Sequence, residues 1–123
     1  MANPQPYFAN KIIWITGASS GIGKELALAY SKISGVSLIL SARRIEKLTE
    51  IAKQCEQNGG KCTVFPLDLE QTDTLDEKSR EAIAIYGRID VLVNNGGISQ
   101  RSLTIETPIA NDRKIMEIDY FSS

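Results

Sequence analysis

The sequence predicts an α/β fold, a doubly wound parallel sheet with helices on both faces. Short β-branched and aliphatic runs alternate with amphipathic segments along the 123 residues, an order typical of such a sheet. The runs are almost continuously apolar, as strands buried on both faces are. A glycine-rich segment over residues 16–23 follows the first run, where such folds turn from strand into helix. Right-handed crossovers then predict about four strands in the order 3-2-1-4.

The first two strands are expected over residues 11–16 and 36–41. A helix follows each, from Ile22 to about Ser34 and from Ile45 to Cys55, and glycines close both helices. Apolar side chains recur there at helical spacing and predict the buried faces. The predicted stripes are Ile22, Leu26, Ala29, Tyr30 and Ile33 in the first helix, and Ile45, Leu48, Ile51, Ala52 and Cys55 in the second.

The second half of the chain continues the alternation. A third strand is expected over residues 62–67, a third helix from Leu75 to Tyr86 and a fourth strand over residues 89–93. A loop over residues 96–107 precedes a last helix, which Pro108 can open because the first turn needs no N–H there. The apolar positions of that last helix are Ile109, Ile115, Met116 and Ile118.

We expect a polar lead-in over residues 1–10 and a single α/β domain over residues 11–123. The last helix reaches Ser123 without a stop signal, so we expect a fragment or truncated product cut within that helix. In a four-stranded sheet the outer edge of the fourth strand would carry unpaired N–H and C=O groups, which promote aggregation.

Composition excludes several classes of function. The net charge of −1 gives no basic surface for nucleic acid or anionic membranes, and no apolar run approaches a membrane span. We therefore expect a cytoplasmic protein with no nucleic-acid or membrane partner. The absence of histidine removes Ser-His-Asp hydrolysis and most zinc sites. Cys55 and Cys62 match neither a redox pair nor a metal knuckle, so we expect reduced, partly buried thiols and no metal.

The glycine-rich turn predicts a dinucleotide site. Gly17 suits a tight turn, Gly21 lets the backbone approach a pyrophosphate, and Gly23 lets the helix pack against the strand. The helix N-terminus offers free N–H groups to phosphates, and Ser19 and Ser20 add hydroxyls. The alternative is an ordinary glycine-rich strand–helix turn.

Two other nucleotide or phosphate chemistries fit poorly. A Walker P-loop needs a shorter glycine spacing and a Ser or Thr after the lysine, whereas Glu25 follows Lys24. A phospho-acceptor domain would need carboxylates around Mg²⁺, and no carboxylate lies at the end of the first strand. Both alternatives are rejected.

The end of the second strand predicts the cofactor NADP(H). In NAD sites an acidic residue about 20 positions after the glycines binds the ribose 2′-OH. That position is Ala42 here, followed by Arg43 and Arg44. A guanidinium can donate two charged hydrogen bonds to a 2′-phosphate, so Arg43 and Arg44 favour NADP(H) over NAD(H).

These motifs together resemble the short-chain dehydrogenase/reductase family, which has the Rossmann-type fold. The segment Thr16-Gly17-Ala18-Ser19-Ser20-Gly21-Ile22-Gly23 matches the glycine motif of that family, and Asn94-Asn95-Gly96-Gly97 resembles its motif after strand four. The stretch over residues 94–102 further resembles one subgroup and its bacterial relatives. The resemblance covers residues 10–123.

The resemblance implies a role for each matching residue. The glycine turn, including Ile22, would line the pyrophosphate, while Asp68 and Leu69 would hold the adenine. Asn94 and Asn95 would tie the central strands and touch the cofactor, and Gly96 and Gly97 would leave room for the nicotinamide ribose. Asp119 stands where the family has a catalytic asparagine, which places the proton relay in question.

The family's catalytic Tyr and Lys are four residues apart, with a Ser upstream. The one such spacing here, Tyr7 to Lys11, precedes the first strand and is far from a reaction site. We therefore expect the front part of an NADP(H)-dependent oxidoreductase that moves hydride between nicotinamide and a small-molecule carbonyl or secondary alcohol. The alternative is an inactive nucleotide-binding fragment. The resemblance also implies a homo-oligomer.

Overall fold

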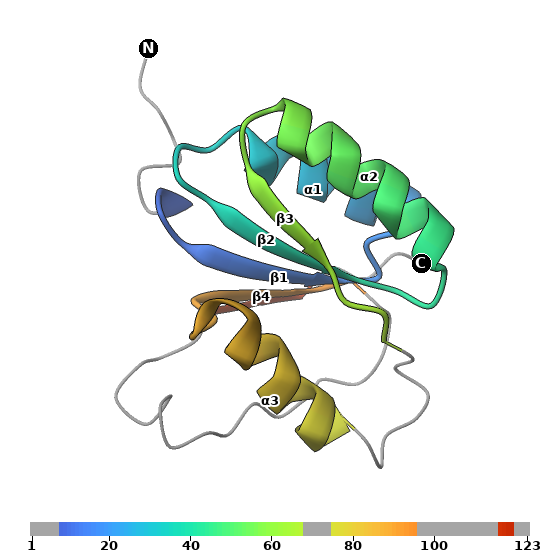
Figure 1. Ribbon diagram of the computed structural model, residues 1–123, viewed down its shortest axis with the longest axis vertical. Helices are drawn as coiled ribbons and strands as arrows, with labels where there is room; N and C mark the ends of the chain where they lie inside the picture. The colour runs from blue at the N-terminus through green and yellow to red at the C-terminus, as the bar shows by residue number, and fades with distance from the viewer. Residues whose placement is uncertain (1–7, 68–74, 96–115, 120–123) are drawn as a thin grey trace.

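The fold is a parallel sheet between two layers of helices. The computed structural model describes residues 8–67, 75–95 and 116–119. In these ranges α1 and α2 cover one face of the sheet and α3 covers the other (Figure 1). The described strands lie in the order β3-β2-β1-β4-β5, which confirms the predicted 3-2-1-4 order and adds a strand beside β4.

Apart from β5, the observed elements begin and end within about three residues of their predicted positions. The strands are β1 Ile12–Thr16, β2 Ser37–Ser41, β3 Lys61–Val64, β4 Val91–Asn94 and β5 Met116–Asp119, and the helices are α1 Gly21–Ser31, α2 Ile45–Gln57 and α3 Leu75–Tyr86. Thr16 is in register with Ser41 of β2 and with Asn94 of β4. The carboxyl ends of the three central strands therefore meet at one edge of the sheet.

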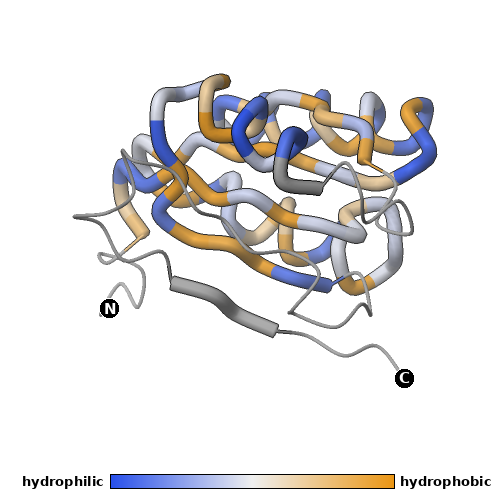
Figure 2. The backbone as a smooth tube through the Cα atoms, turned by 90° about the horizontal axis from the view of Figure 1, so that it is seen from below, coloured by the Kyte–Doolittle hydropathy of each residue, from blue (hydrophilic) through white to orange (hydrophobic). Residues whose placement is uncertain are grey.

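Two apolar clusters lie on the two faces of the sheet. Ile13 and Ile15 belong to the cluster beneath α1 and α2, whereas Ile12 and Trp14 belong to the cluster beneath α3. This division follows from the two-residue period of a strand, which sends successive side chains to opposite faces. In Figure 2 the strands carry long hydrophobic stretches and the helices alternate between hydrophobic and hydrophilic turns.

The predicted buried face of α1 was partly wrong. The side that packs on the sheet carries Gly23, Ala27 and Ser31, whereas Ile22 is 41% exposed. Gly23 lets the helix pack closely against the Gly17–Ala18 turn, and the neighbouring Ile22 faces outward on the helix. In α2 the predicted stripe is buried apart from Ile45, which is 51% exposed at the start of the helix.

The expected last helix is also corrected. Met116–Asp119 forms β5, parallel to β4, with Met116 opposite Val91 and Asp119 opposite Asn94. Apolar and polar residues alternate in this segment, so it fits a strand as well as a helix. Pairing with the open edge of β4 satisfies backbone groups that would otherwise lack partners. The predicted helical residues 108–115 lie outside the described part of the chain.

The described helices and the two cysteines can be compared with what was expected of membrane spans and of the thiols. Neither α1, α2 nor α3 has the length and apolar character needed to cross a membrane. Both cysteines are free thiols, with Cys55 buried and Cys62 partly exposed, as predicted.

Candidate functional site

The glycine turn lies at the carboxyl edge of the sheet, between β1 and α1. Gly17 has a φ of 64°, a left-handed conformation that glycine adopts without strain. The turn is fixed to β2 by a hydrogen bond from the Ala18 N–H to the Ser41 carbonyl, at 3.0 Å. The turn and the end of β2 therefore form one connected edge.

Ser20 is the N-cap of α1. Its Oγ accepts hydrogen bonds from the Gly23 N–H at 3.0 Å and from Asn95 Nδ2 at 2.8 Å, and it donates to the Gly17 carbonyl at 3.0 Å. These three bonds use the one proton and both lone pairs of the hydroxyl. Ser20 thus holds the turn together. The neighbouring Ser19 hydroxyl makes no such bonds to the turn within the described residues.

Gly21 and Gly23 differ in their surroundings. A Cβ at Gly23 would lie 2.2 Å from the Gly17 carbonyl oxygen and 2.8 Å from Ala18 Cα, so no other residue fits without moving backbone. A Cβ at Gly21 would have no atom within 4 Å. Packing within the protein therefore explains Gly23 but not Gly21. The N–H groups of Gly21 and Ile22 belong to the first turn of the helix, which has no intrahelical acceptors for them.

Thr16 and the two asparagines connect β1 to β4. The Thr16 hydroxyl donates to Asn94 Oδ1 at 3.1 Å and accepts from the Asn95 N–H at 3.2 Å. Asn95 Nδ2 donates to the Gly17 carbonyl at 3.2 Å as well as to Ser20. From the sequence, both asparagines were expected to lie near the turn, but no role was predicted for Thr16. A polar residue at the end of an apolar strand could have indicated such a contact between strands.

Asn95 Oδ1 is a buried acceptor at this edge. Asn95 is 3% exposed, and Oδ1 has no hydrogen-bond partner in the part of the chain that the structure describes. A buried polar atom without a partner costs free energy, about 1–3 kcal/mol. The contacts of Nδ2 fix the orientation of the amide, so Oδ1 stays a buried acceptor without a partner among the described residues.

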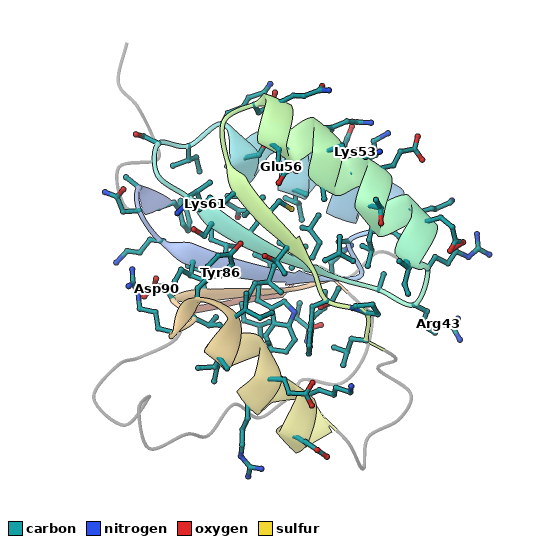
Figure 3. The ribbon with its side chains drawn as sticks, viewed as in Figure 1. Arg43, Lys53, Glu56, Lys61, Tyr86 and Asp90 are labelled. Atoms are coloured by element: carbon teal, nitrogen blue, oxygen red, sulfur yellow. The ribbon has the colours of Figure 1, made fainter. Side chains whose placement is uncertain are left out.

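The end of β2 carries the predicted arginines. Arg43 and Arg44 are exposed, and Arg44 is the N-cap of α2 without a side-chain cap. The Arg43 side chain extends away from the sheet at the start of α2 (Figure 3). Ser41, two residues earlier, is fully buried and accepts a hydrogen bond from Trp14 Nε1 at 2.7 Å. Sequence reasoning missed both partners of this bond.

The remaining predicted site residues are only partly described. Asp68, Leu69, Gly96 and Gly97 lie outside the described residues. The backbone of Asp119 lies in β5 opposite Asn94, which places it at the carboxyl edge. The predicted role of Asp119 stays a prediction.

Perturbed titratable groups lie elsewhere in the described part of the chain. A hydrogen bond from Cys62 lowers the pKa of Cys55, and the same contact together with burial raises the pKa of Cys62. Burial raises the pKa of Tyr86, despite its 2.7 Å hydrogen bond with Thr63. Figure 3 shows Tyr86 and Asp90 on the side of the molecule opposite Arg43. Among the described residues, the carboxyl edge thus carries neutral donors, the Asn95 Oδ1 acceptor, Asp119 at the end of β5, and the cations Arg43 and Arg44.

Comparisons with known proteins agree with this geometry. Residues 11–123 match the family model described as short chain dehydrogenase. The human dehydrogenase/reductase SDR family member 7 is 44% identical over 124 residues, which cover 98% of this chain and 36% of that protein. This chain therefore spans little more than a third of that curated relative.

Two solved structures show the same arrangement. A metagenomic short-chain oxidoreductase in complex with NADP is 32% identical, with a TM-score of 0.68, and the match covers 74% of this chain and 41% of that one. An NADH-dependent reductase complexed with NAD is 25% identical, with a TM-score of 0.67, over 75% of this chain and 38% of that one. Relatives of this fold thus occur with either nucleotide.

Proposed function

Because the chain belongs to the short-chain dehydrogenase/reductase family, we propose that its carboxyl edge binds NADP(H) for an oxidoreductase acting on a small carbonyl or secondary alcohol. The observation that carries the proposal is the buried Asn95 Oδ1 beside the glycine turn, an acceptor without a partner among residues 8–67, 75–95 and 116–119. The missing donor is what a ribose hydroxyl would supply. The NADP complex of the metagenomic relative supports the choice of cofactor class.

The glycine turn would hold the pyrophosphate. The N–H groups of Gly21 and Ile22 and the positive end of the α1 dipole would face the negative charge. The open space over Gly21 would let the backbone approach, and the Ser19 hydroxyl would add a donor. Ser20 and Gly23 would act indirectly, by keeping the turn in shape.

The end of β2 would select the nucleotide. Ala42 offers no carboxylate to accept a ribose 2′-OH or to repel a 2′-phosphate. Arg43 is exposed where the 2′-position of the ribose would lie, and Arg44 is its neighbour at the start of α2. A guanidinium binds a phosphate through paired, charged hydrogen bonds, so the two arginines favour NADP(H).

The remaining predicted residues complete the proposed pocket. Asp68 and Leu69 would contact the adenine, and Gly96 and Gly97 would leave space for the nicotinamide ribose. Asn94, held by Thr16, would keep β1 and β4 at a fixed separation while Asn95 turns Oδ1 toward the cofactor. Every polar contact in this part of the proposal comes from the carboxyl ends of parallel strands, where open α/β sheets bind ligands.

The nicotinamide would supply the hydride acceptor or donor when the cofactor is bound. The part of the protein described here would contribute binding and orientation of that group, which lowers the entropic cost of reaction. Asp119, beside Asn94 in the ladder, would stand near the relay that moves the proton. A carboxylate there lacks the amide donor of the family's asparagine, so we propose that it weakens the relay.

The test is a pair of charge-removing variants in the protein that carries this chain. Arg43→Ala should weaken NADPH binding by about 2 kcal/mol, roughly thirtyfold, and leave NADH binding nearly unchanged, because only NADPH carries the 2′-phosphate. Lys53→Ala removes one exposed positive charge further along α2 and should change neither affinity. Calorimetric or fluorescence titration measures both. Equal affinity of the unaltered protein for NADPH and NADH would refute the cofactor choice.

A further inference from the structure

Trp14, the sole tryptophan of the chain, lies in the middle of β1 on the face covered by α3. Its side chain is fully buried, and its indole N–H donates to Ser41 Oγ at 2.7 Å. In the parallel register Trp14 is opposite Ile39, so Ser41 lies two residues further along β2 on the same face. The indole thus reaches diagonally to the last residue of β2.

Apolar packing alone does not account for this pair. A phenylalanine would fill much of the same space, and burying an indole N–H and a hydroxyl is costly unless they bond to each other. The indole itself is held in place, since the ring of Phe65 packs edge-on against it with centroids 6.2 Å apart. Trp14 is therefore a fixed donor at a defined point beneath the end of β2.

Ser41 is the residue through which this bond reaches the carboxyl edge. Its carbonyl accepts from the Ala18 N–H of the glycine turn at 3.0 Å, and the carbonyl of Ala42 accepts from the Leu67 N–H at 3.1 Å. The chain then leaves the sheet, and Arg43 follows within two residues of Ser41. The side-chain bond from Trp14 thus ties the last residue of β2 to the core two residues before the exposed arginine.

We propose that Trp14 is a positioning residue for cofactor specificity, which acts through Ser41 to hold the end of β2 so that Arg43 meets the 2′-phosphate of NADP(H). The inference rests on the proposed function and adds a determinant that lies in the core and touches no cofactor. Losing the Trp14–Ser41 bond loosens the exit of β2. The backbone bond from the Ala18 N–H to the Ser41 carbonyl remains in both variants and keeps the glycine turn in place, so the ligand group affected is the 2′-phosphate.

The test compares three single substitutions in the protein that carries this chain. Trp14→Phe removes the indole N–H, Ser41→Ala removes the acceptor, and Tyr86→Phe removes a hydrogen bond of the same length, with Thr63, on the side of the molecule away from Arg43. Titration with NADPH and NADH should show that Trp14→Phe and Ser41→Ala each lower the NADPH-over-NADH preference three- to tenfold. Tyr86→Phe should leave that preference unchanged, although all three lower the melting temperature.

A double-substitution cycle tests whether the effect passes through Arg43. In an Arg43→Ala background, Ser41→Ala should change the NADPH-over-NADH preference less than twofold, since coupled residues do not act additively. A preference retained in both Trp14→Phe and Ser41→Ala would overturn the inference and leave the proposed function standing. An unaltered protein without preference would overturn the cofactor choice itself. If the Trp14→Phe variant does not fold, the NADPH-over-NADH preference of the Ser41→Ala variant tests the inference by itself.

Discussion

The two ends of the sheet differ in whether their buried polar groups have hydrogen-bond partners within the described residues. At the amino end, Asp90 Oδ2 accepts from the Ile12 N–H at 2.9 Å and from Arg88 Nε at 3.0 Å. Arg88 also donates to the Asn10 carbonyl at 3.2 Å. This network closes on itself and ties the starts of β1 and β4 together.

The carboxyl end has a similar number of cross-strand contacts but does not close. Ser20 and Thr16 have their bonds within the protein, whereas Asn95 Oδ1 is buried without a partner in the described residues. Figure 3 shows Asp90 and Arg43 at opposite sides of the molecule. The comparison teaches that burial of polar groups at a strand end does not mark a site. We propose that the unsatisfied acceptor beside an open glycine does.

The largest effect should come from the packed glycine of the carboxyl end. Gly23→Ala would force a Cβ to within 2.2 Å of the Gly17 oxygen, and we expect it to lower the free energy of unfolding by about 3 kcal/mol. Urea unfolding measures this change. Gly21→Ala is the matched control: its Cβ meets open space, so stability should hold or rise by about 0.5 kcal/mol.

The same two variants separate folding from binding. If the open space over Gly21 lets the backbone approach the pyrophosphate, the Gly21→Ala variant should fold normally but bind both NADPH and NADH more weakly. Both nucleotides are affected because both carry the pyrophosphate. Normal binding by Gly21→Ala would contradict the role proposed for the open side of the turn.

The next effect should come from the closed network. Asp90→Ala leaves the Ile12 N–H and the Arg88 guanidinium without their acceptor. The arginine side chain is 37% exposed, so water compensates part of the loss, and we expect about 2 kcal/mol of destabilisation. Thermal or urea unfolding measures it. The affinities for NADPH and NADH should not change, and a selective loss of either would show that the amino end is not purely structural.

The smallest effect should come from the open acceptor. Asn95→Ala removes Oδ1 together with the Nδ2 bonds to Gly17 and Ser20, and it should weaken NADPH and NADH equally, by about 1 kcal/mol or roughly fivefold. An equal loss is expected because the ribose hydroxyls are common to both nucleotides. The affinities of the folded variant are measured by titration. Unchanged affinity for both nucleotides, or a loss of affinity for NADPH alone as expected for Arg43→Ala, would contradict the ribose contact.

The sequence by itself determined the strand order, the position of the glycine turn and the alternation of strands with helices. The glycine turn and the alternation depend on local patterns, since apolar period and glycine position act over a few residues. The order of the four predicted strands follows from right-handed crossover connections. Leu75–Tyr86 forms α3 over the predicted residues, and the four predicted strands all form. The resemblance carried by the glycine and Asn-Asn-Gly-Gly motifs likewise agrees with the family model and with the SDR family member 7 relatives.

Only the tertiary structure decided which polar atoms meet. Ser20 and Asn95 are 75 residues apart, and Trp14 and Ser41 are 27 apart, so no local pattern shows that one bonds the other. The outward position of Ile22 and the strand at Met116–Asp119 were likewise set by packing against other segments, the Gly17–Ala18 turn and the edge of β4. Local periodicity tells which side chains prefer burial. Register and close packing between strands fix which donor faces which acceptor, and which acceptor has no partner among the described residues.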